Sequence, residues 1–309
     1  MQFILFPPGL IGYPTAAIHE WEHDCSVSDV ELVVRTADSL GYDYLSMPDH
    51  IVQAADHVEL MGKKWPEQFA TLAYFAAITK NIQLYTNVNV VPHRSPILMA
   101  KTVATIDWLS GGRMALGLGA GHSKSELGVL GVPFEQRGTI TNEYILAMKE
   151  LWTNEVASFH GDHVSFDEIV CDPRPVRKPH PPIFIGGNSR PAMRRAAALG
   201  DGWAPWLVEP RELPGCIDYL YSQPGLRDNA RPFEIVMPLS RMNVDDVTHD
   251  VLGDTIIPGA ENEVMEELAT LQKLGTTGIL TFFPATSSLN EYIERITWFA
   301  QDVMPSFRD

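Results

Sequence analysis

Short apolar runs alternate with amphipathic segments along most of the chain. Such runs, closed by glycine, proline or polar residues, are typical of strands that are buried on both faces of a parallel sheet. Eight runs are predicted as strands: Gln2–Phe6, Tyr42–Met47, Ile82–Val91, Arg113–Leu118, Pro182–Gly186, Trp203–Pro205, Phe233–Asn243 and Gly278–Phe283.

Helices are predicted between these strands, where apolar residues recur at helical spacing behind a serine or a proline. The first helix is capped by Ser26 or Ser28 and ends at about Leu40. The other predicted helices are Pro66–Thr79, Ile97–Leu109, Thr141–Trp152, Pro191–Leu199, Pro210–Tyr221, Glu261–Leu274 and Leu289–Val303. Segment 154–182 breaks the alternation with prolines and two short alternating runs, which favour a surface hairpin and an extended strap. No polar linker divides the chain, so the sequence predicts an α/β protein with one (β/α)8 TIM-barrel domain over residues 1–309.

Composition excludes several classes of function. The chain has 39 Asp and Glu against 23 Lys and Arg, and its net charge of −16 argues against a nucleic-acid or membrane-surface partner. Its three cysteines lie far apart without C-x-x-C spacing, which fits a reducing cytoplasm better than a disulfide framework. No apolar run approaches the ~20 residues of a membrane helix, and the start of the chain lacks the basic region of a signal peptide. We therefore expect a cytoplasmic protein.

One stretch formally matches a zinc motif. Residues His19–His23 read H-E-W-E-H, but they lie between Pro14 and the polar residues that follow Cys25. A zinc protease needs this motif on a helix inside the apolar core. An acidic surface or lid loop is the better interpretation, and we predict no metal site.

A glycine-rich turn, Gly119–Gly121, follows the predicted strand Arg113–Leu118. Ser123 and Glu126 behind it match a capping box at the start of a helix. A strand, a glycine turn and a capped helix are how a parallel sheet exposes backbone N–H groups to a ligand. The turn is not a dinucleotide fingerprint, because His122 stands where the third glycine belongs. A turn needed only for packing is the alternative.

The barrel prediction brings scattered residues to one site, because active sites of such barrels lie at the carboxyl ends of the strands. Residues predicted at or just after those ends are Asp49, His50, Asn87, His93, Arg94, Gly119, Ala120, Gly121, His122, Asn188, Ser189, Trp203 and Trp206. This convergence indicates that the glycine turn serves a ligand.

Four segments carry a family resemblance: GYDYLSMPDHI (41–51), PHRSPILMAKTVATIDWLSGGRMALGLGAG (92–121), LGVPFEQRG (130–138) and PHPPIFIGGNSRPAMRRAAALGDGW (179–203). In them the chain resembles the bacterial luciferase-like monooxygenase superfamily, and within it the branch that uses the deazaflavin coenzyme F-420. The segments cover about a third of the chain, and their order and spacing match the family through roughly residue 203.

The resemblance implies catalytic roles for Asp49, His50 and His122. His50 would lie near the reactive carbon of the deazaflavin and handle the substrate proton, which suits an imidazole near neutral pH. A structural histidine that is hydrogen-bonded by Asp49 is the alternative. His122 stands where the best-known sugar-phosphate dehydrogenase of the family has a catalytic glutamate, so it would act as acid or base, or only orient the substrate.

The resemblance also implies three cofactor contacts. A bulge with a non-prolyl cis peptide at Asn87-Val88 would back the ring, and an ordinary trans strand is the alternative. Phosphate would be held by two turns made of Gly119, Ala120, Gly121, Gly186, Gly187, Asn188 and Ser189. The second turn opens a helix, whose dipole favours an anion. Arg190, Arg194 and Arg195 are candidate counter-charges, and a solvated helix face is the alternative.

Two classes of function fit these residues. The first is an F-420-dependent oxidoreductase that transfers a hydride to or from a small alcohol, enone or imine. Its close rival is an FMN-dependent monooxygenase that uses reduced flavin and oxygen on the same fold. A binding or regulatory barrel without chemistry is the distinct alternative. A homodimer is expected as well.

Overall fold

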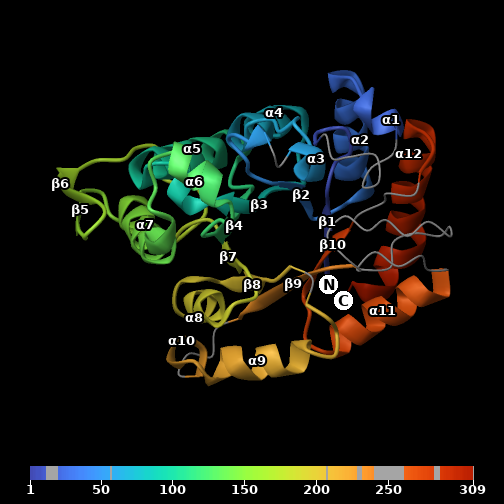
Figure 1. The fold of residues 1–309 in the computed structure, drawn as a ribbon. Helices are drawn as coiled ribbons and strands as arrows, with labels where there is room; N and C mark the ends of the chain where they lie inside the picture. The colour runs from blue at the N-terminus through green and yellow to red at the C-terminus, as the bar shows by residue number, and fades with distance from the viewer. Residues whose placement is uncertain are drawn as a thin grey trace.

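Eight parallel strands close into a barrel in the computed structural model, which describes residues 1–11, 20–55, 58–206, 208–227, 232–239, 261–281 and 286–308 (Figure 1). The barrel strands are β1 Gln2–Leu5, β2 Tyr44–Met47, β3 Gln83–Val90, β4 Met114–Gly119, β7 Ile183–Gly186, β8 Gly202–Ala204, β9 Glu234–Pro238 and β10 Gly278–Thr281. They pair in the order β1-β10-β9-β8-β7-β4-β3-β2 and back to β1. All eight predicted strands are confirmed, and each begins within two residues of the predicted start. Positions 240–243 and 282–283 of two predictions lie outside the described residues.

Helices follow the barrel strands as the apolar spacing predicts. The longer ones are α2 Val27–Leu40, α4 Gln68–Ile78, α5 Pro96–Ser110, α7 Arg137–Thr153, α8 Arg190–Leu199, α9 Leu213–Ser222, α11 Glu261–Lys273 and α12 Leu289–Trp298. The shorter ones are α1 Glu20–His23, α3 Val58–Met61, α6 Lys124–Val129 and α10 Pro224–Arg227. Ser26 caps α2 in a complete capping box with Asp29, and Gly41 closes it in the left-handed conformation.

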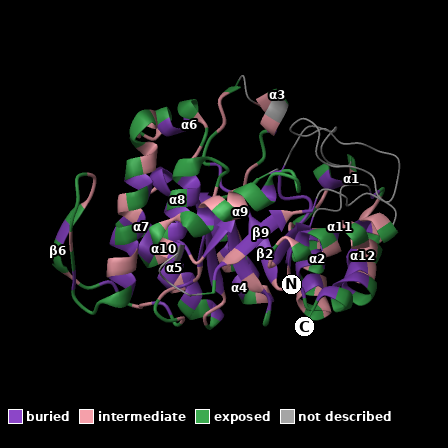
Figure 2. Cartoon of the chain, turned by 90° about the horizontal axis from the view of Figure 1, so that it is seen from below, coloured by how far each residue is buried: buried purple, intermediate pink, exposed green. Residues whose placement is uncertain are grey.

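The barrel interior receives one side chain from each strand. Ile4, Tyr44, Tyr85, Ala115, Phe184, Ala204, Val236 and Leu280 form a cluster separate from the larger core between strands and helices. Tyr85 meets Tyr44 and Phe184 edge to face, with ring centroids 5.8 and 5.6 Å apart. Figure 2 shows these buried strands at the centre, with exposed residues on the outer faces of the helices. The barrel is therefore a packed core, and only its strand ends are open to carry chemistry.

The predicted hairpin and strap are confirmed. Strands β5 Ala157–His160 and β6 Ser165–Ile169 pair antiparallel and project beyond α7 (Figure 1). Glu143 of α7 holds the turn, because its carboxylate accepts the backbone N–H groups of Asp162, His163 and Val164 at 2.7–2.9 Å. The hairpin is thus anchored to the outside of the barrel, away from the strand ends.

The H-E-x-x-H segment is only partly a surface feature. Glu20–His23 forms α1, and Glu22 is buried, where its carboxylate accepts the Gly9 N–H at 3.2 Å. The expectation of an exposed acidic loop is therefore wrong for Glu22, and His19 lies outside the described residues. Among the residues that the structure describes, no three His, Cys, Asp or Glu side chains are arranged to hold a metal ion. None of the described helices is long and apolar enough to cross a membrane.

Candidate active site

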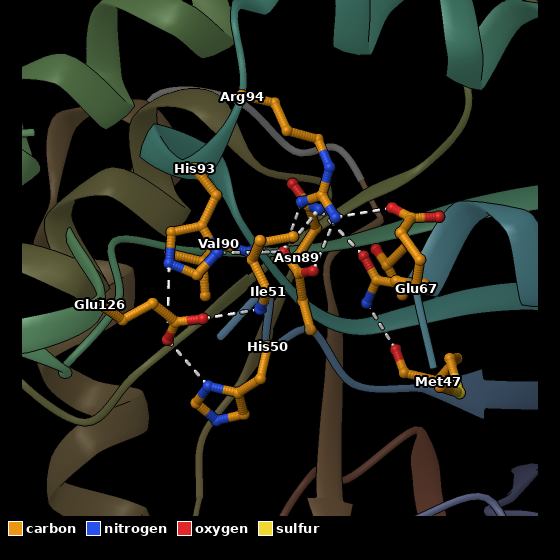
Figure 3. A network of polar contacts seen from close by, with 12 residues as sticks. Met47, His50, Ile51, Glu67, Asn89, Val90, His93, Arg94 and Glu126 are labelled. Atoms are coloured by element: carbon orange, nitrogen blue, oxygen red, sulfur yellow. Dashed lines mark hydrogen bonds and ion pairs between the residues drawn. The ribbon is translucent and has the colours of Figure 1, made fainter. Parts of the chain in front are cut away.

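His50 and Glu126 form a buried pair at the carboxyl ends of β2 and β4. His50 Nδ1 lies 2.8 Å from Glu126 Oε2, and both side chains are less than a tenth exposed. The other oxygen, Oε1, accepts the backbone N–H groups of Ile51 and Val52 at 2.6 and 3.3 Å. Figure 3 shows the ring with Nδ1 toward Glu126 and Nε2 on the opposite side. The pair therefore presents Nε2 as the reactive atom of His50.

The charge of Glu126 fixes the hydrogen-bonding state of His50. Burial raises the pKa of Glu126, but the hydrogen bonds from His50 and the Ile51 N–H outweigh burial, and its pKa lies below the usual range. An ionised Glu126 accepts hydrogen bonds only, so His50 donates from Nδ1, and in the neutral imidazole the lone pair is on Nε2. Trp65 packs against the same imidazole edge to face, with centroids 4.5 Å apart, which limits rotation of the ring.

The predicted capping box at α6 is only half formed. Ser123 Oγ accepts the Glu126 N–H at 3.2 Å, as expected of an N-cap. The Glu126 carboxylate does not return to Ser123, because it is engaged by His50 and by the backbone after it. Glu126 was therefore predicted only as part of the helix cap, and its role as the partner of His50 was not predicted.

Asp49 does not hydrogen-bond His50, contrary to the structural alternative for that histidine. It joins the end of β2 to the end of β3, where Arg94 donates to both of its oxygens at 2.7 and 2.9 Å. Its Oδ2 also accepts Asn89 Nδ2 and the Val90 N–H, both at 3.0 Å. The Asp49 side chain is fully buried. Its position is that of a structural hub beside the reactive histidine.

Further polar side chains complete this hub. Asn89 also donates to Gln68 Oε1 at 2.9 Å, and Gln68 donates to the Met47 carbonyl at 2.6 Å. Arg94 donates to Glu67 at 2.7 Å (Figure 3). Gln68, Glu67 and Asn89 were not among the predicted site residues. The only signal for Gln68 in the sequence is a polar residue at the start of an otherwise apolar helix.

The Asn87-Val88 peptide bond is cis, as the family resemblance implies, and it coincides with a register shift between Thr86 and Asn89. The Val88 side chain lies between two of the predicted cofactor glycines. A Cβ on Gly119 would lie 2.8 Å from Val88 Cγ2, and a Cβ on Gly186 would lie 2.8 Å from Val88 Cγ1. Packing against Val88 therefore gives a reason for glycine at both positions. For the turn after β4, this is the alternative interpretation in which the glycine is needed only for packing.

Of the other residues of the first turn, His122 lies beside His50. Gly121 has a positive φ of 81°, and His122 after it is exposed, with its ring edge to face with His50 at 5.8 Å between centroids. Ala120 between the glycines is partly exposed. The structure thus brings His50, His122 and Glu126 together. His50 and His122 were predicted as site residues, and Glu126 was not.

The second predicted turn lies at the start of α8. Gly187 has φ 108°, and residues 187–190 are exposed. Ser189 Oγ accepts the Ala192 N–H at 3.4 Å, a long cap that leaves the hydroxyl able to donate elsewhere. Asn188 is already engaged, because its amide pairs with the backbone N–H and carbonyl of Trp206. Backbone, Ser189 and Arg190 remain as the donors at this helix start.

The three arginines of α8 differ in their surroundings. Arg195 is buried and donates to Asn142 Oδ1 and the Gly138 carbonyl, at 2.5 and 2.9 Å. Its interpretation as a counter-charge for a ligand is therefore wrong. Arg194 donates to the Tyr219 hydroxyl at 3.1 Å, and Arg190 lies over the Tyr219 ring at 4.4 Å. Both of these are on the exposed face of the helix.

Comparison with known proteins finds a family model, relatives and solved structures that match this chain. Residues 1–221 match the family model of luciferase-like monooxygenases. The uncharacterised protein Rv0953c of Mycobacterium tuberculosis is 28% identical over 277 residues, which cover 85% of this chain and 90% of that protein.

Two further matches carry named activities. The FMNH(2)-dependent dimethylsulfone monooxygenase of Pseudomonas putida is 41% identical over 110 residues, or 35% of this chain and 30% of that protein. The solved structure of an F420-dependent secondary alcohol dehydrogenase, in complex with an F420-acetone adduct, superimposes with a TM-score of 0.77. It is 18% identical and covers 100% of this chain and 99% of its own. At that identity the superposition shows the common fold.

Proposed function

The chain belongs to the luciferase-like monooxygenase family, and on that basis we propose that it transfers a hydride between coenzyme F-420 and a small organic substrate. The observation that carries this proposal is the His50–Glu126 pair, whose free Nε2 stands at the carboxyl end of the barrel. An alcohol that loses a hydride from carbon must also lose its hydroxyl proton, and a ketone or enone needs that proton back. A histidine oriented by a buried carboxylate serves both directions.

The proton transfer follows from the geometry of the pair. His50 Nε2 takes the hydroxyl proton as the substrate carbon gives up its hydride, and it returns the proton in the reverse reaction. The imidazolium formed in the forward direction is stabilised by Glu126, which lies 2.8 Å from Nδ1. When bound, the coenzyme supplies the carbon that accepts or gives the hydride.

The residues at the start of α8 fit the phosphate of such a coenzyme. Gly187 offers its backbone without a side chain, Ser189 has a hydroxyl, and the first turn of the helix holds no acidic residue. The Arg190 guanidinium adds a positive charge in a chain whose net charge is −16. We assign phosphate binding to this turn in preference to the Gly119–Gly121 turn.

An FMN-dependent monooxygenase is the second candidate. The 41% identity to the FMNH(2)-dependent dimethylsulfone monooxygenase favours it, although only over 110 residues. The His50–Glu126 pair serves either enzyme. The absorbance and mass spectra of the cofactor that co-purifies test the proposal: the deazaflavin is expected, and FMN would favour the second candidate.

Replacing Ser189 by alanine tests the phosphate assignment. Loss of one hydroxyl donor should weaken F-420 binding by about five- to thirty-fold. Thermal stability should change little, because the cap to Ala192 is long at 3.4 Å. The matched control is Ser26→Ala, which removes the N-cap of α2 and should lower the melting temperature without changing affinity. Wild-type affinity in folded Ser189→Ala would remove this hydroxyl from the site.

A further inference from the structure

His93 is a buried titratable group that the proposed chemistry does not use. It follows β3, its side chain is 1% exposed, and it lies between the two carboxylates of the site. Nδ1 is 3.6 Å from Asp49 Oδ2, and Nε2 is 3.8 Å from Glu126 Oε2 (Figure 3). Both distances are too long for hydrogen bonds, and Nδ1 is buried with no hydrogen-bond partner among the described residues. His93 thus lies near both carboxylates without a hydrogen bond to either.

The two carboxylates are compensated unequally. Asp49 has a permanent counter-charge in Arg94, which binds both of its oxygens. Among the described residues, the partners of Glu126 apart from the two histidines are dipolar donors, the N–H groups of Ile51 and Val52. Burying an uncompensated carboxylate is costly, so a proton on one of the histidines is the available counter-charge.

The two imidazoles compete for the same oxygen atom. Their nearest nitrogens lie 2.8 and 3.8 Å from Glu126 Oε2, and so no more than about 6.6 Å from each other. We propose that His93 is a positioning residue for the proton on His50. Both histidines face the same Glu126 oxygen, so when one of them is protonated, the other binds its proton less tightly. For its catalytic consequence, this proposal rests on the proton-transfer role proposed for His50.

Other charged and titratable side chains surround the two histidines and Glu126. Asp49, which follows β2, lies 3.6 Å from His93, and Arg94 is the next residue in the chain. Arg94 pairs with Asp49 and also with Glu67, which stands at the start of α4. His122 faces His50 at 5.8 Å between ring centroids. Replacing His93 with glutamine keeps a donor toward Glu126 but removes the imidazole that can carry a charge.

The test is an NMR titration of the histidine Cε1–H signals in the cofactor-free protein, assigned with single His→Gln variants at positions 50, 93 and 122. In the wild type, the His50 signal should titrate in two steps, because two interacting sites share the protons. In His93→Gln it should titrate in one step, with its midpoint moved to higher pH, since a competing imidazole within about 6.6 Å has been removed. His160→Gln, in the exposed hairpin, should leave the His50 curve unchanged.

A His50 curve in His93→Gln that coincides with the wild type, or moves to lower pH, would overturn the proposal. If the variant does not fold, the wild-type curve decides alone, because a single one-proton step at His50 contradicts coupling. The acid limb of the pH–rate profile should move in the same direction as the NMR midpoint. A moved midpoint with an unmoved rate profile would leave the coupling standing and reject His50 as the proton-transfer residue.

Discussion

Replacing His50 by alanine is expected to lower turnover by about 10²–10⁴-fold while F-420 affinity stays within a few-fold of the wild type. The reason is that Glu126 holds His50 Nδ1 at 2.8 Å and so orients Nε2 of the same ring to exchange the substrate proton. The phosphate donors proposed on α8 are on a different strand-to-helix turn, so they remain intact. The measurement is anaerobic steady-state reduction of F-420 with an alcohol found by screening, beside a binding titration.

A matched control comes from the hairpin. His163 lies near Thr139 on the outside of the barrel, and His163→Ala should leave turnover unchanged. Glu126→Gln should also lower turnover, because a neutral amide stabilises the imidazolium less than a carboxylate does. Turnover of His50→Ala within a few-fold of the wild type would mean that the residue is structural or that solvent supplies the proton.

Replacing Asp49 by asparagine is expected to destabilise the protein by about 3 kcal/mol, the largest stability effect we expect at the site. The Asp49 side chain is fully buried, and the Arg94 guanidinium is 12% exposed, so Arg94 would lose the carboxylate that binds it at two points. Arg94 would still have its ion pair with Glu67, so the expected loss of stability is at the lower end of the range for a broken buried ion pair. Urea unfolding at pH 7 measures it.

The pH dependence of this loss has a definite sign. Burial raises the pKa of Asp49, but His93 and Arg94 outweigh burial and lower it. The ionised aspartate therefore stabilises the fold above its unfolded pKa of about 3.9, and this stabilisation is lost as the pH falls further. The difference between the wild type and Asp49→Asn should shrink below that pH. Glu135→Gln, in an exposed pair with Lys124, should change stability by less than about 0.5 kcal/mol, and an equally small change in Asp49→Asn would contradict the hub.

The fold could be predicted from the sequence because strand burial imposes a simple pattern. Runs such as Pro182–Gly186 and Gly278–Phe283 are apolar along most of their length, and their alternation with helices leaves few architectures other than a barrel. Helix α7 begins at Arg137, four residues before the predicted Thr141, because a 3₁₀ turn at Phe134–Gln136 leads into it. Such a turn has no apolar spacing to reveal it.

The site could be predicted only in part, because side-chain partners across strands depend on distances that a linear pattern does not contain. His50 was found from its place after a strand. Its partner Glu126, however, stands three residues after a serine, where a local cap explains it equally well. Likewise, Gly119 and Gly186 read as ligand-facing glycines, and only the position of Val88 shows a packing reason for both. Local chemistry and tertiary packing select the same residue types at these positions.

The most direct test of the proposed function is a titration of the purified, cofactor-free protein with F-420 and with FMN under identical conditions. F-420 is expected to bind more tightly, with substrate-dependent hydride transfer that proceeds without oxygen. Equal or tighter binding of FMN, together with product formation that requires oxygen, would contradict it and assign the protein to the monooxygenases of its family.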